Sequence, residues 1–304
     1  MEDRLQKFAR LVDAGNFTKA SADLHMSQPA LSMAISKLER ELHTALLVRG
    51  ARPLQLTPAG ELAYAAAQEL AVRTRNLANQ LAALADEPAS IRLGMIDSVA
   101  STLFSSDDAL AQLEQRAKIS VVVNNSRFLL ESATRSQLDM AFIAEQPRAL
   151  PVTLEPMFVA TEPLVAICHA SQHTKTQQEL RAGRLPHFIS YDQSSTSYEL
   201  IIRALQQQGI TPEPTFYSTS PEVMLRLVLL GRGTAVLPYL LVREHIKDGT
   251  LALLGRRGQP AIIGRRITSI KRRDAVPAIP LTSLFETLRA LIGQLNDEIA
   301  QLAA

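Results

Sequence analysis

The segment from Gln28 to Leu42 restricts the possible folds of this chain more than any other stretch. Apolar residues recur in it at intervals of four, three and four positions: Leu31, Ile35, Leu38 and Leu42. This spacing places them on one face of an α-helix. Pro29 fits the first turn, where its missing N–H would have had no partner within the helix. The segment therefore predicts a helix that buries one side and exposes a polar side.

Helical segments also precede this helix. Apolar spacing before Gly15 predicts a first helix, and Thr18 is suited to cap a second one. Two short apolar runs, 46–48 and 54–56, flank a turn after the third helix and predict a two-stranded wing. Residues 1–58 are therefore expected to form a winged helix-turn-helix, which is all-α with a small β wing.

A long helix is expected from Pro58 to Ala85, because this stretch is rich in Ala, Leu, Glu and Gln. Apolar residues lie along one side of it: Leu62, Ala66, Leu70, Leu77, Leu81 and Leu84. A helix of this length with an apolar stripe needs a partner, either in a second copy of the chain or in its own chain. We assign residues 59–88 to a linker and dimerisation helix.

Residues 89–304 alternate between apolar runs and helical patterns. The candidate strands are Ile91–Met95, Ile119–Val123, Met140–Ala144, Leu164–Cys168, Phe188–Ser190 and Thr234–Leu237. The helical patterns fall at 108–116, 127–136, 197–208, 221–230, 239–247 and 281–302. This order predicts an α/β domain with mainly parallel sheets.

Composition limits the classes of function. The 304 residues carry a net charge of +2, so no global field indicates a nucleic-acid partner. No stretch is apolar enough to span a membrane and no secretion signal is present, so the cytoplasm is the expected location. The single cysteine, Cys168, is expected to be a buried filler, and no metal-ligand spacing, phosphate-binding loop or catalytic set occurs. We therefore expect no enzyme activity, no metal and no cofactor.

The polar side of the third helix has the chemistry of a DNA-reading surface. Short polar side chains near a helix N-terminus can reach base edges in a major groove, where Gln reads adenine and Pro or Met contacts a thymine methyl. Basic residues of the wing would contact phosphates. The candidate DNA-binding residues are Thr18, Ser27, Gln28, Pro29, Ser32, Met33, Ser36, Lys37, Arg49 and Arg52. On pattern alone, a small helical bundle with a polar outer face is the alternative.

Two strings carry a family resemblance. Ser27–Ser32 reads Ser-Gln-Pro-Ala-Leu-Ser and is followed six residues later by Leu-Glu, and Leu56–Gly60 reads Leu-Thr-Pro-Ala-Gly. Residues 1–85 thus resemble the N-terminal part of a LysR-type transcriptional regulator, although family members often have Arg where this chain has Met33. The resemblance implies double-stranded DNA as a partner, homodimers that pair into homotetramers, and control by a small-molecule effector. RNA polymerase is a further candidate partner.

The resemblance continues more loosely through residues 91–304, where Leu138–Phe142 and Leu227–Pro238 resemble elements of the family's effector domain. It implies a fold like that of periplasmic binding proteins, with two α/β subdomains joined by crossover strands near 160–165 and 264–269. Subdomain I would comprise residues 91–161 and 268–304, and subdomain II residues 162–267.

Ligands of open α/β sheets bind where strands end and helices begin. Polar segments at such positions, with the end of the third strand, supply the effector-binding candidates Ser98, Ser126, Ala144, Ser195, Thr196 and Ser197. Ala144 stands where family members that bind dicarboxylates can carry Arg, and Arg127 and Arg148 are the nearest cations in the sequence. We therefore expect a small polar ligand that is neutral or singly charged. The basic groups at 256–257, 265–266 and 271–273 are expected to be solvated surface.

The leading hypothesis is a sequence-specific DNA-binding regulator controlled by an effector bound between the subdomains. The alternative is a ligand-independent regulator whose C-terminal domain serves only oligomerisation. A solute-binding protein or an enzyme with an accessory N-terminal domain is disfavoured, because the sequence has neither an export signal nor a catalytic set.

Overall fold

The computed structural model describes residues 1–51, 53–85, 89–105, 111, 117–144, 150–256, 259–260, 262–275 and 282–303. The described residues do not include Arg52 or Arg148. They include only residue 111 of the helix predicted at 108–116. The chain divides into two compact units, Met1–Glu87 with Asp274–Val276, and Pro88–Arg273 with Pro277–Ala304. Within the described ranges, no helix is long and apolar enough to cross a membrane.

Three short helices form the start of the N-terminal unit: α1 (Glu2–Ala14), α2 (Phe17–Asp23) and α3 (Gln28–Glu41). The predicted stripe of α3 is buried at Leu31, Ile35 and Leu38, whereas Leu42 ends the helix and is 36% exposed. These residues share one core with the other helices and the chain beyond α3, formed by Phe8, Leu11, Ala20, Leu31, Ile35, Leu38 and Leu46. Because the apolar face of α3 is used in this core, its polar face is left free.

The cap predicted for the second helix is wrong by two residues. Asn16, in extended backbone, accepts the backbone N–H of Lys19 at 2.8 Å through its side chain. The helix therefore begins at Phe17, and Thr18 lies in its first turn, where its carbonyl oxygen accepts the Ser21 hydroxyl at 2.9 Å.

The wing is smaller than predicted. One backbone bridge joins Leu47 to Leu56, and no longer strand pair forms in the part of this unit that the structure describes. A carboxylate from α3 orders the chain that leads into it, because one oxygen of Glu39 accepts the backbone N–H groups of Leu46 at 2.8 Å and Leu47 at 3.3 Å. The Leu-Glu pair of the family string thus has a physical role in joining α3 to the wing.

The Leu-Thr-Pro-Ala-Gly string begins the long helix α4 (Pro58–Leu84). The hydroxyl of Thr57 caps this helix by accepting the backbone N–H of Gly60 at 3.0 Å, and it donates to the carbonyl oxygen of Ala45 at 2.7 Å. Gly60 passes so close to the backbone of Leu46 that a Cβ at this position would lie 2.0 Å from the Leu46 carbonyl oxygen. Only glycine fits this approach, so the string fixes how the wing meets α4.

In the part of the chain that the structure describes, the second unit is built on a nine-stranded mixed sheet. Its order is β2-β1-β3-β11-β4-β7-β5-β6, and β8 pairs with β4. The strands are β1 (Ala89–Met95), β2 (Ala117–Val123), β3 (Met140–Ala144), β4 (Leu154–His169), β5 (Arg184–Tyr191), β6 (Thr211–Ser218), β7 (Thr234–Pro238), β8 (Leu251–Leu253) and β11 (Ile262–Arg272). A separate two-stranded sheet joins β9 (Gly255–Arg256) and β10 (Gln259–Pro260).

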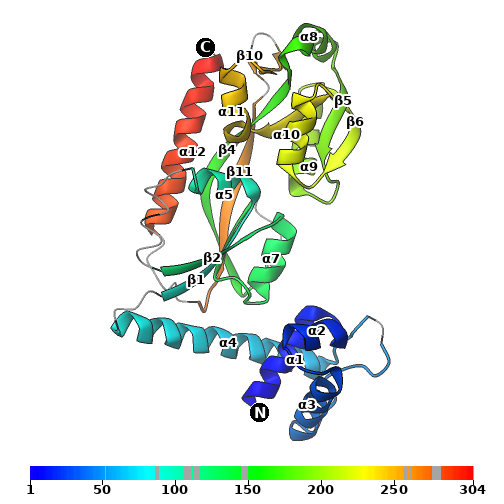
Figure 1. Ribbon diagram of the computed structural model, residues 1–304, viewed down its shortest axis with the longest axis vertical. Coiled ribbons are helices and arrows are strands. Elements are labelled where there is room, and N and C mark those ends of the chain that lie inside the picture. Colours follow the sequence, from blue (N-terminus) through cyan, green and yellow to red (C-terminus); the bar gives the residue numbers. More distant parts are fainter. Residues whose placement is uncertain are drawn as a thin grey trace. The chain divides into compact units, whose positions relative to one another are not determined.

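Two hydrophobic cores divide this unit into two subdomains. The first core gathers side chains of β1, β3 and their helices, and the second gathers those of β5, β7 and theirs. The helices are α5 (Asp97–Leu103), α7 (Ser126–Thr134), the 3-10 turn η1 (Ala170–Gln172), α8 (His173–Arg181), α9 (Thr196–Gln207), α10 (Pro221–Leu229), α11 (Tyr239–Lys247) and α12 (Thr282–Ala303). The long strands β4 and β11 run through both subdomains (Figure 1).

The expectation of mainly parallel sheets is correct only at the two ends. The strands β1, β2 and β3 pair in parallel, as do β5, β6 and β7. In the middle, β3, β11, β4 and β7 pair antiparallel, because β4 and β11 cross between the subdomains in opposite directions. The six predicted strands are all present, with β4 and β11 extending well beyond the predicted crossover segments.

The sequence did not indicate β6, which contains Pro212 and Pro214. Prolines are tolerated at a sheet edge, and β6 is the last strand of the sheet order. The helix α12 contributes to both cores: Leu284 and Leu288 lie in the first, whereas Leu295 and Ile299 lie in the second. The end of α12 therefore packs with the subdomain to which the sequence did not assign it.

Candidate functional site

The free side of α3 carries most of the side chains predicted to read DNA. The exposed residues there are Gln28, Pro29, Ser32, Met33, Ser36 and Lys37, and Met33 is 73% exposed. Ser27 is also exposed, but its hydroxyl oxygen accepts the backbone N–H of Ala30 at 3.3 Å. Ser27 therefore holds the start of α3 in place for the side chains that follow it.

A surface hollow brings part of this predicted set together. It is lined by residues of the α1–α2 turn, α3 and the wing, among them Thr18, Gln28, Ser32, Ser36 and Arg49. The remaining exposed residues of α3 do not line the hollow. Short polar groups beside a guanidinium at one surface suit contacts with base edges and phosphates.

The second unit contains a cleft of about 310 Å³ where strand-to-helix turns converge. The turns that line it follow β1, β2, β5 and β6, and they lead into α5, α7, α9 and α10. Of the predicted effector-binding residues, the lining includes Ser98, Ser126, Ala144, Ser195 and Ser197. Thr196 lies between two of them but is exposed at the start of α9 rather than part of the lining.

One lining residue of the cleft, Arg265, belongs to a buried ion pair. Arg265 of β11 donates to one carboxylate oxygen of Glu162 of β4, from Nε at 2.9 Å and from Nη2 at 2.6 Å. Both side chains are nearly inaccessible, with 5% and 3% of their surfaces exposed. Burial opposes the charge on Arg265, but the charge and hydrogen bonds of Glu162 together with the neighbouring Tyr191 hydroxyl outweigh burial and raise the pKa of the guanidinium. A buried charge of this kind needs a paired partner, and Glu162 supplies it.

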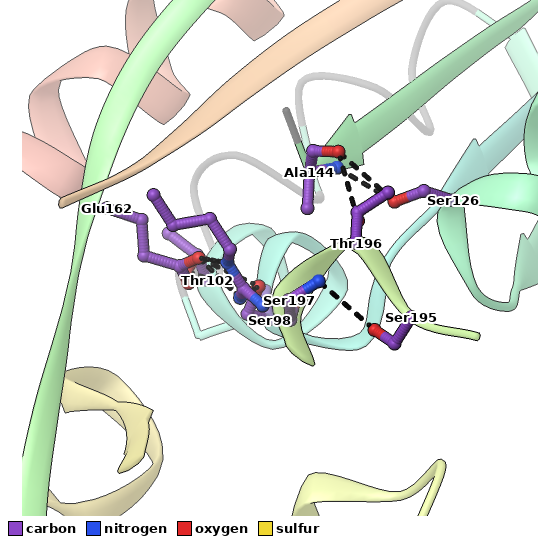
Figure 2. A network of polar contacts seen from close by, with 9 residues as sticks. Ser98, Thr102, Ser126, Ala144, Glu162, Ser195, Thr196 and Ser197 are labelled. Atoms are coloured by element: carbon purple, nitrogen blue, oxygen red, sulfur yellow. Dashed lines mark hydrogen bonds and ion pairs between the residues drawn. The ribbon is translucent and has the colours of Figure 1, made fainter. Parts of the chain in front are cut away.

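The same guanidinium joins the two subdomains. Its Nη2 donates to the hydroxyl of Ser98 on α5 at 2.8 Å, and its Nη1 donates to the hydroxyl of Ser197 on α9 at 2.9 Å. Ser98 also donates to Glu162 at 3.2 Å. In Figure 2, Ser98 and Ser197 lie together beside Glu162. Two hydroxyls that the sequence assigned to the ligand are thus bound to this ion pair.

A second set of contacts lies at the end of β3. The hydroxyl oxygen of Ser126 accepts the backbone N–H of Ala144 at 3.0 Å. From the other subdomain, the hydroxyl of Thr196 donates to the carbonyl oxygen of Ala144 at 3.5 Å. Figure 2 shows Ser126 and Thr196 converging on Ala144. A long hydrogen bond therefore joins the two subdomains at Ala144, which lines the cleft.

Two further titratable groups line the cleft. Burial raises the pKa of the Tyr191 hydroxyl to about 12. Loss of water around Asp97, together with the negative charge of Glu222, raises the pKa of that carboxyl. Asp97 is exposed to the cleft. The lining therefore offers hydroxyl donors and one carboxylate beside a neutralised ion pair.

Sequence reasoning missed Arg265 and Glu162. The groups at 265–266 and 271–273 were expected on the surface, but Arg265 and Arg272 are only 4% and 7% exposed. A usable signal exists in strand alternation, because side chains two residues apart share a face and Arg265 stands between the buried Ile263 and Ile267. Arg266, on the other face, is exposed and lies over the ring of Phe158 at 4.9 Å. The side chains at 256–257 lie outside the described residues.

The sequence offered Arg127 and Arg148 as the cations nearest to Ala144, but the cation that lines the cleft among the described residues is Arg265. It comes from β11, far from Ala144 in sequence, so a search of neighbouring positions could not find it. Arg127 is exposed and is not part of the lining.

Comparison with known proteins gives two family matches. Residues 3–61 match the family described as "Bacterial regulatory helix-turn-helix protein, lysR family", and residues 85–292 match "LysR substrate binding domain". Among relatives, "HTH-type transcriptional regulator BudR" of Raoultella terrigena is 30% identical over 77% of this chain and 83% of its own length. A "Probable hydrogen peroxide-inducible genes activator" of Streptomyces viridosporus is 30% identical over 98% of this chain and 96% of its own length.

A solved structure is similar over nearly the whole chain. A full-length OxyR variant from Pseudomonas aeruginosa covers 96% of this chain and 94% of its own, with a TM-score of 0.64 at 20% identity. At this level of identity the likeness concerns the fold alone. Together with the family matches it confirms the predicted fold class, a helix-turn-helix unit joined to an α/β unit of two subdomains.

Proposed function

Because this chain belongs to the LysR family of DNA-binding transcriptional regulators, we propose that a small molecule bound in the cleft of the α/β unit controls how it acts on DNA. Membership of this family makes the chain a transcription regulator and not an enzyme. The observation that carries the proposal is the cleft of about 310 Å³, in which polar side chains of both subdomains converge. A cavity with a few convergent polar groups is the usual form of a small-molecule site.

The DNA-binding half of the proposal rests on the free face of α3 and the adjoining wing. We assign base contacts to Gln28, Pro29, Ser32, Met33 and Ser36, because they are exposed on one helix face near its N-terminus. Phosphate contacts are assigned to Thr18, Ser27, Lys37, Arg49 and Arg52, which would position the helix without reading sequence. Met33 would offer a flexible apolar contact, suited to a thymine methyl.

The assembly proposed is a dimer through α4, which then pairs into a tetramer. Four leucines on this helix are largely exposed in the single chain: Leu62 (74%), Leu77 (56%), Leu81 (55%) and Leu84 (85%). Exposed large apolar side chains repeated along a long helix favour packing against a second copy. Residues 1–58 would then bind DNA and residues 59–88 would join the copies, while residues 89–304 receive the ligand.

The mechanism proposed is a shift between two arrangements of the subdomains. In the described residues the cleft is spanned by Arg265, which reaches hydroxyls of both subdomains, and by the contact between Thr196 and Ala144. A ligand that competes for the hydroxyls of the cleft would change the relative stability of closed and open arrangements. It can shift that balance only as far as its affinities for the two arrangements differ.

The test measures DNA binding and ligand binding on the full chain. Sequences bound by the chain are first selected from a random double-stranded DNA pool, and a metabolite panel is then screened by thermal shift. We expect at least one compound to raise the melting temperature and to change the footprint or affinity on the selected DNA. Ala144→Leu, which adds an apolar side chain to the cleft, should abolish both effects, and Ala182→Leu at the exposed end of α8 should abolish neither.

The result also separates the two regulatory alternatives. If DNA binding is sequence-specific but no compound and no cleft substitution changes it, the α/β unit serves only assembly. If the chain shows no sequence preference and no salt dependence in DNA binding, the DNA-binding assignment itself is wrong.

A further inference from the structure

The ion pair in the cleft leaves little net charge for an anionic ligand. Among the described residues, Arg265 is the cation that lines the cleft, and Glu162 neutralises it by accepting its Nε–H at 2.9 Å and an Nη2–H at 2.6 Å. Two further donors of the guanidinium are occupied by Ser98 and Ser197. A dianion entering this cleft would lose its hydration without gaining an unpaired positive charge from the described lining, which is unfavourable.

Hydroxyl protons are among the donors that stay available. The Tyr191 side chain is 5% exposed and lines the cleft, yet its hydroxyl has no partner with hydrogen-bond geometry among the described residues, although the Arg265 guanidinium lies beside it. An unsatisfied buried hydroxyl is costly and gains most from an added acceptor. The Ser197 oxygen is taken up by Arg265, which leaves its own proton for an acceptor on the ligand.

Asp97 gives the cleft a negative side. It is the carboxylate in the described lining, it is exposed to the cleft, and it has no ion-pair partner among the described residues. Glu222 of α10, which pairs with Arg226 at 3.3 Å on the surface, is a second negative charge in its surroundings. An ammonium group placed here would satisfy Asp97, whereas a second carboxylate of a ligand would be repelled.

We propose that the cleft selects a small zwitterion, whose cationic amino group pairs with Asp97 and whose carboxylate accepts the hydroxyl protons of Tyr191 and Ser197. The inference rests on the proposed function of the cleft as the effector site. It names Asp97 and Tyr191 as the residues that determine specificity, at the two ends of the ligand. The cleft volume of about 310 Å³ lies at the small end of ligand pockets, which suits a molecule of amino-acid size.

The test is a charge-matched panel on the full chain. The twenty protein amino acids are compared by thermal shift, and each that binds is measured by calorimetry beside its deaminated acid and its decarboxylated amine. Succinate and glutarate represent dianions. We expect at least one amino acid to bind about tenfold or more tightly than either of its truncated analogues and than both dianions, as loss of a charged hydrogen bond implies.

Two variants assign the ends of the ligand. Asp97→Asn should remove the preference for the amino acid over its deaminated acid, while Asp248→Asn, a matched change in an exposed turn, should keep it. Tyr191→Phe should weaken the binding of the amino acid and of its deaminated acid by similar factors. Tyr198→Phe on α9 should leave both affinities unchanged.

The outcomes separate the zwitterion assignment from the broader proposal that the cleft is an effector site. Tighter binding of a plain carboxylate or of a dianion, or an unchanged preference in Asp97→Asn, would overturn the zwitterion assignment and leave the cleft as an effector site. Absence of binding by every compound in the panel would overturn both this assignment and, with the wider metabolite screen, the proposed function.

Discussion

Glu162 and Arg265 face each other from the two strands that run through both subdomains, with Arg265 Nη2 and a Glu162 carboxylate oxygen 2.6 Å apart. Because β4 carries Glu162 and β11 carries Arg265, the pair lies where the crossover strands meet the cleft. The contact places a fixed charge pair between the proposed ligand site and the crossover strands, about which the subdomains would move.

Removing one partner of this pair should destabilise the α/β unit strongly. Glu162→Gln leaves the Arg265 charge buried without compensation, and we expect a loss of about 3–5 kcal/mol in the free energy of unfolding. Urea unfolding of the full chain measures it. Glu155→Gln is the matched control, because Glu155 pairs with Lys271 at 2.9 Å on the surface and should change stability by about 1 kcal/mol or less. Equal losses in the two variants would contradict the buried pair.

Base reading and phosphate contact should separate in the DNA-binding unit. Gln28→Ala should reduce the preference for the base that Gln28 reads by about 1–3 kcal/mol. Arg49→Ala should weaken binding to all DNA sequences alike and should lower the slope of log affinity against log salt concentration by about one. Binding of each variant to the selected site and to single-base substitutions, at several salt concentrations, measures both effects. If Gln28→Ala weakens binding to every DNA sequence equally, the base contact assigned to Gln28 is wrong.

The close approach of Gly60 to the wing should make this position intolerant of any side chain. A Cβ would lie 2.0 Å from the Leu46 carbonyl oxygen, so Gly60→Ala must displace backbone and should cost about 1–3 kcal/mol through overpacking. Gly293 in α12 has open space around its missing Cβ, so Gly293→Ala should instead stabilise by about 0.5–1 kcal/mol. Thermal unfolding of both variants checks the two signs, and stabilisation by Gly60→Ala would contradict the packing described for the wing.

The buried thiol should be inert in the native chain. Cys168 is fully buried in β4, and burial raises the pKa of its thiol to about 11. The nucleophile is the thiolate, so at pH 8 we expect no reaction with a thiol reagent until the chain unfolds, and no effect of peroxide on DNA binding. Rapid labelling of the native chain would show that this thiol is accessible.

The same thiol gives a pH dependence with a definite sign. The unfolded chain loses the thiol proton near pH 9, whereas the folded chain keeps it until about pH 11. The contribution of Cys168 to the free energy of unfolding is therefore complete below pH 9 and is lost as the pH rises through 11, a total decrease of about 3 kcal/mol. The difference between the wild-type chain and Cys168→Ala, followed by urea unfolding from pH 8 to 11, isolates this contribution from other groups that titrate at alkaline pH. A constant difference would contradict the shift.

Prediction from the sequence succeeded where the pattern is local. The apolar spacing of α3, the run of helix formers in α4 and the six apolar strands each depend on neighbours within a few residues, and each is present. The cap of α2 and the extent of the wing were predicted wrongly, because a nearby Asn outcompeted Thr18 and because Glu39 bonds backbone groups that a strand pair would otherwise share.

The site divides in the same way. By itself the sequence determined the family strings, the polar face of α3 and the hydroxyl residues at the starts of helices, since their types and spacings are properties of a continuous segment. Only the tertiary structure decided that Arg265, Asp97 and Tyr191 meet in one cleft and that Glu162 pairs with Arg265. Arg265 lies 103 positions from Glu162. Its neighbour Arg266 is exposed while Arg265 is buried, because which face of a strand is buried depends on what the rest of the chain packs against it.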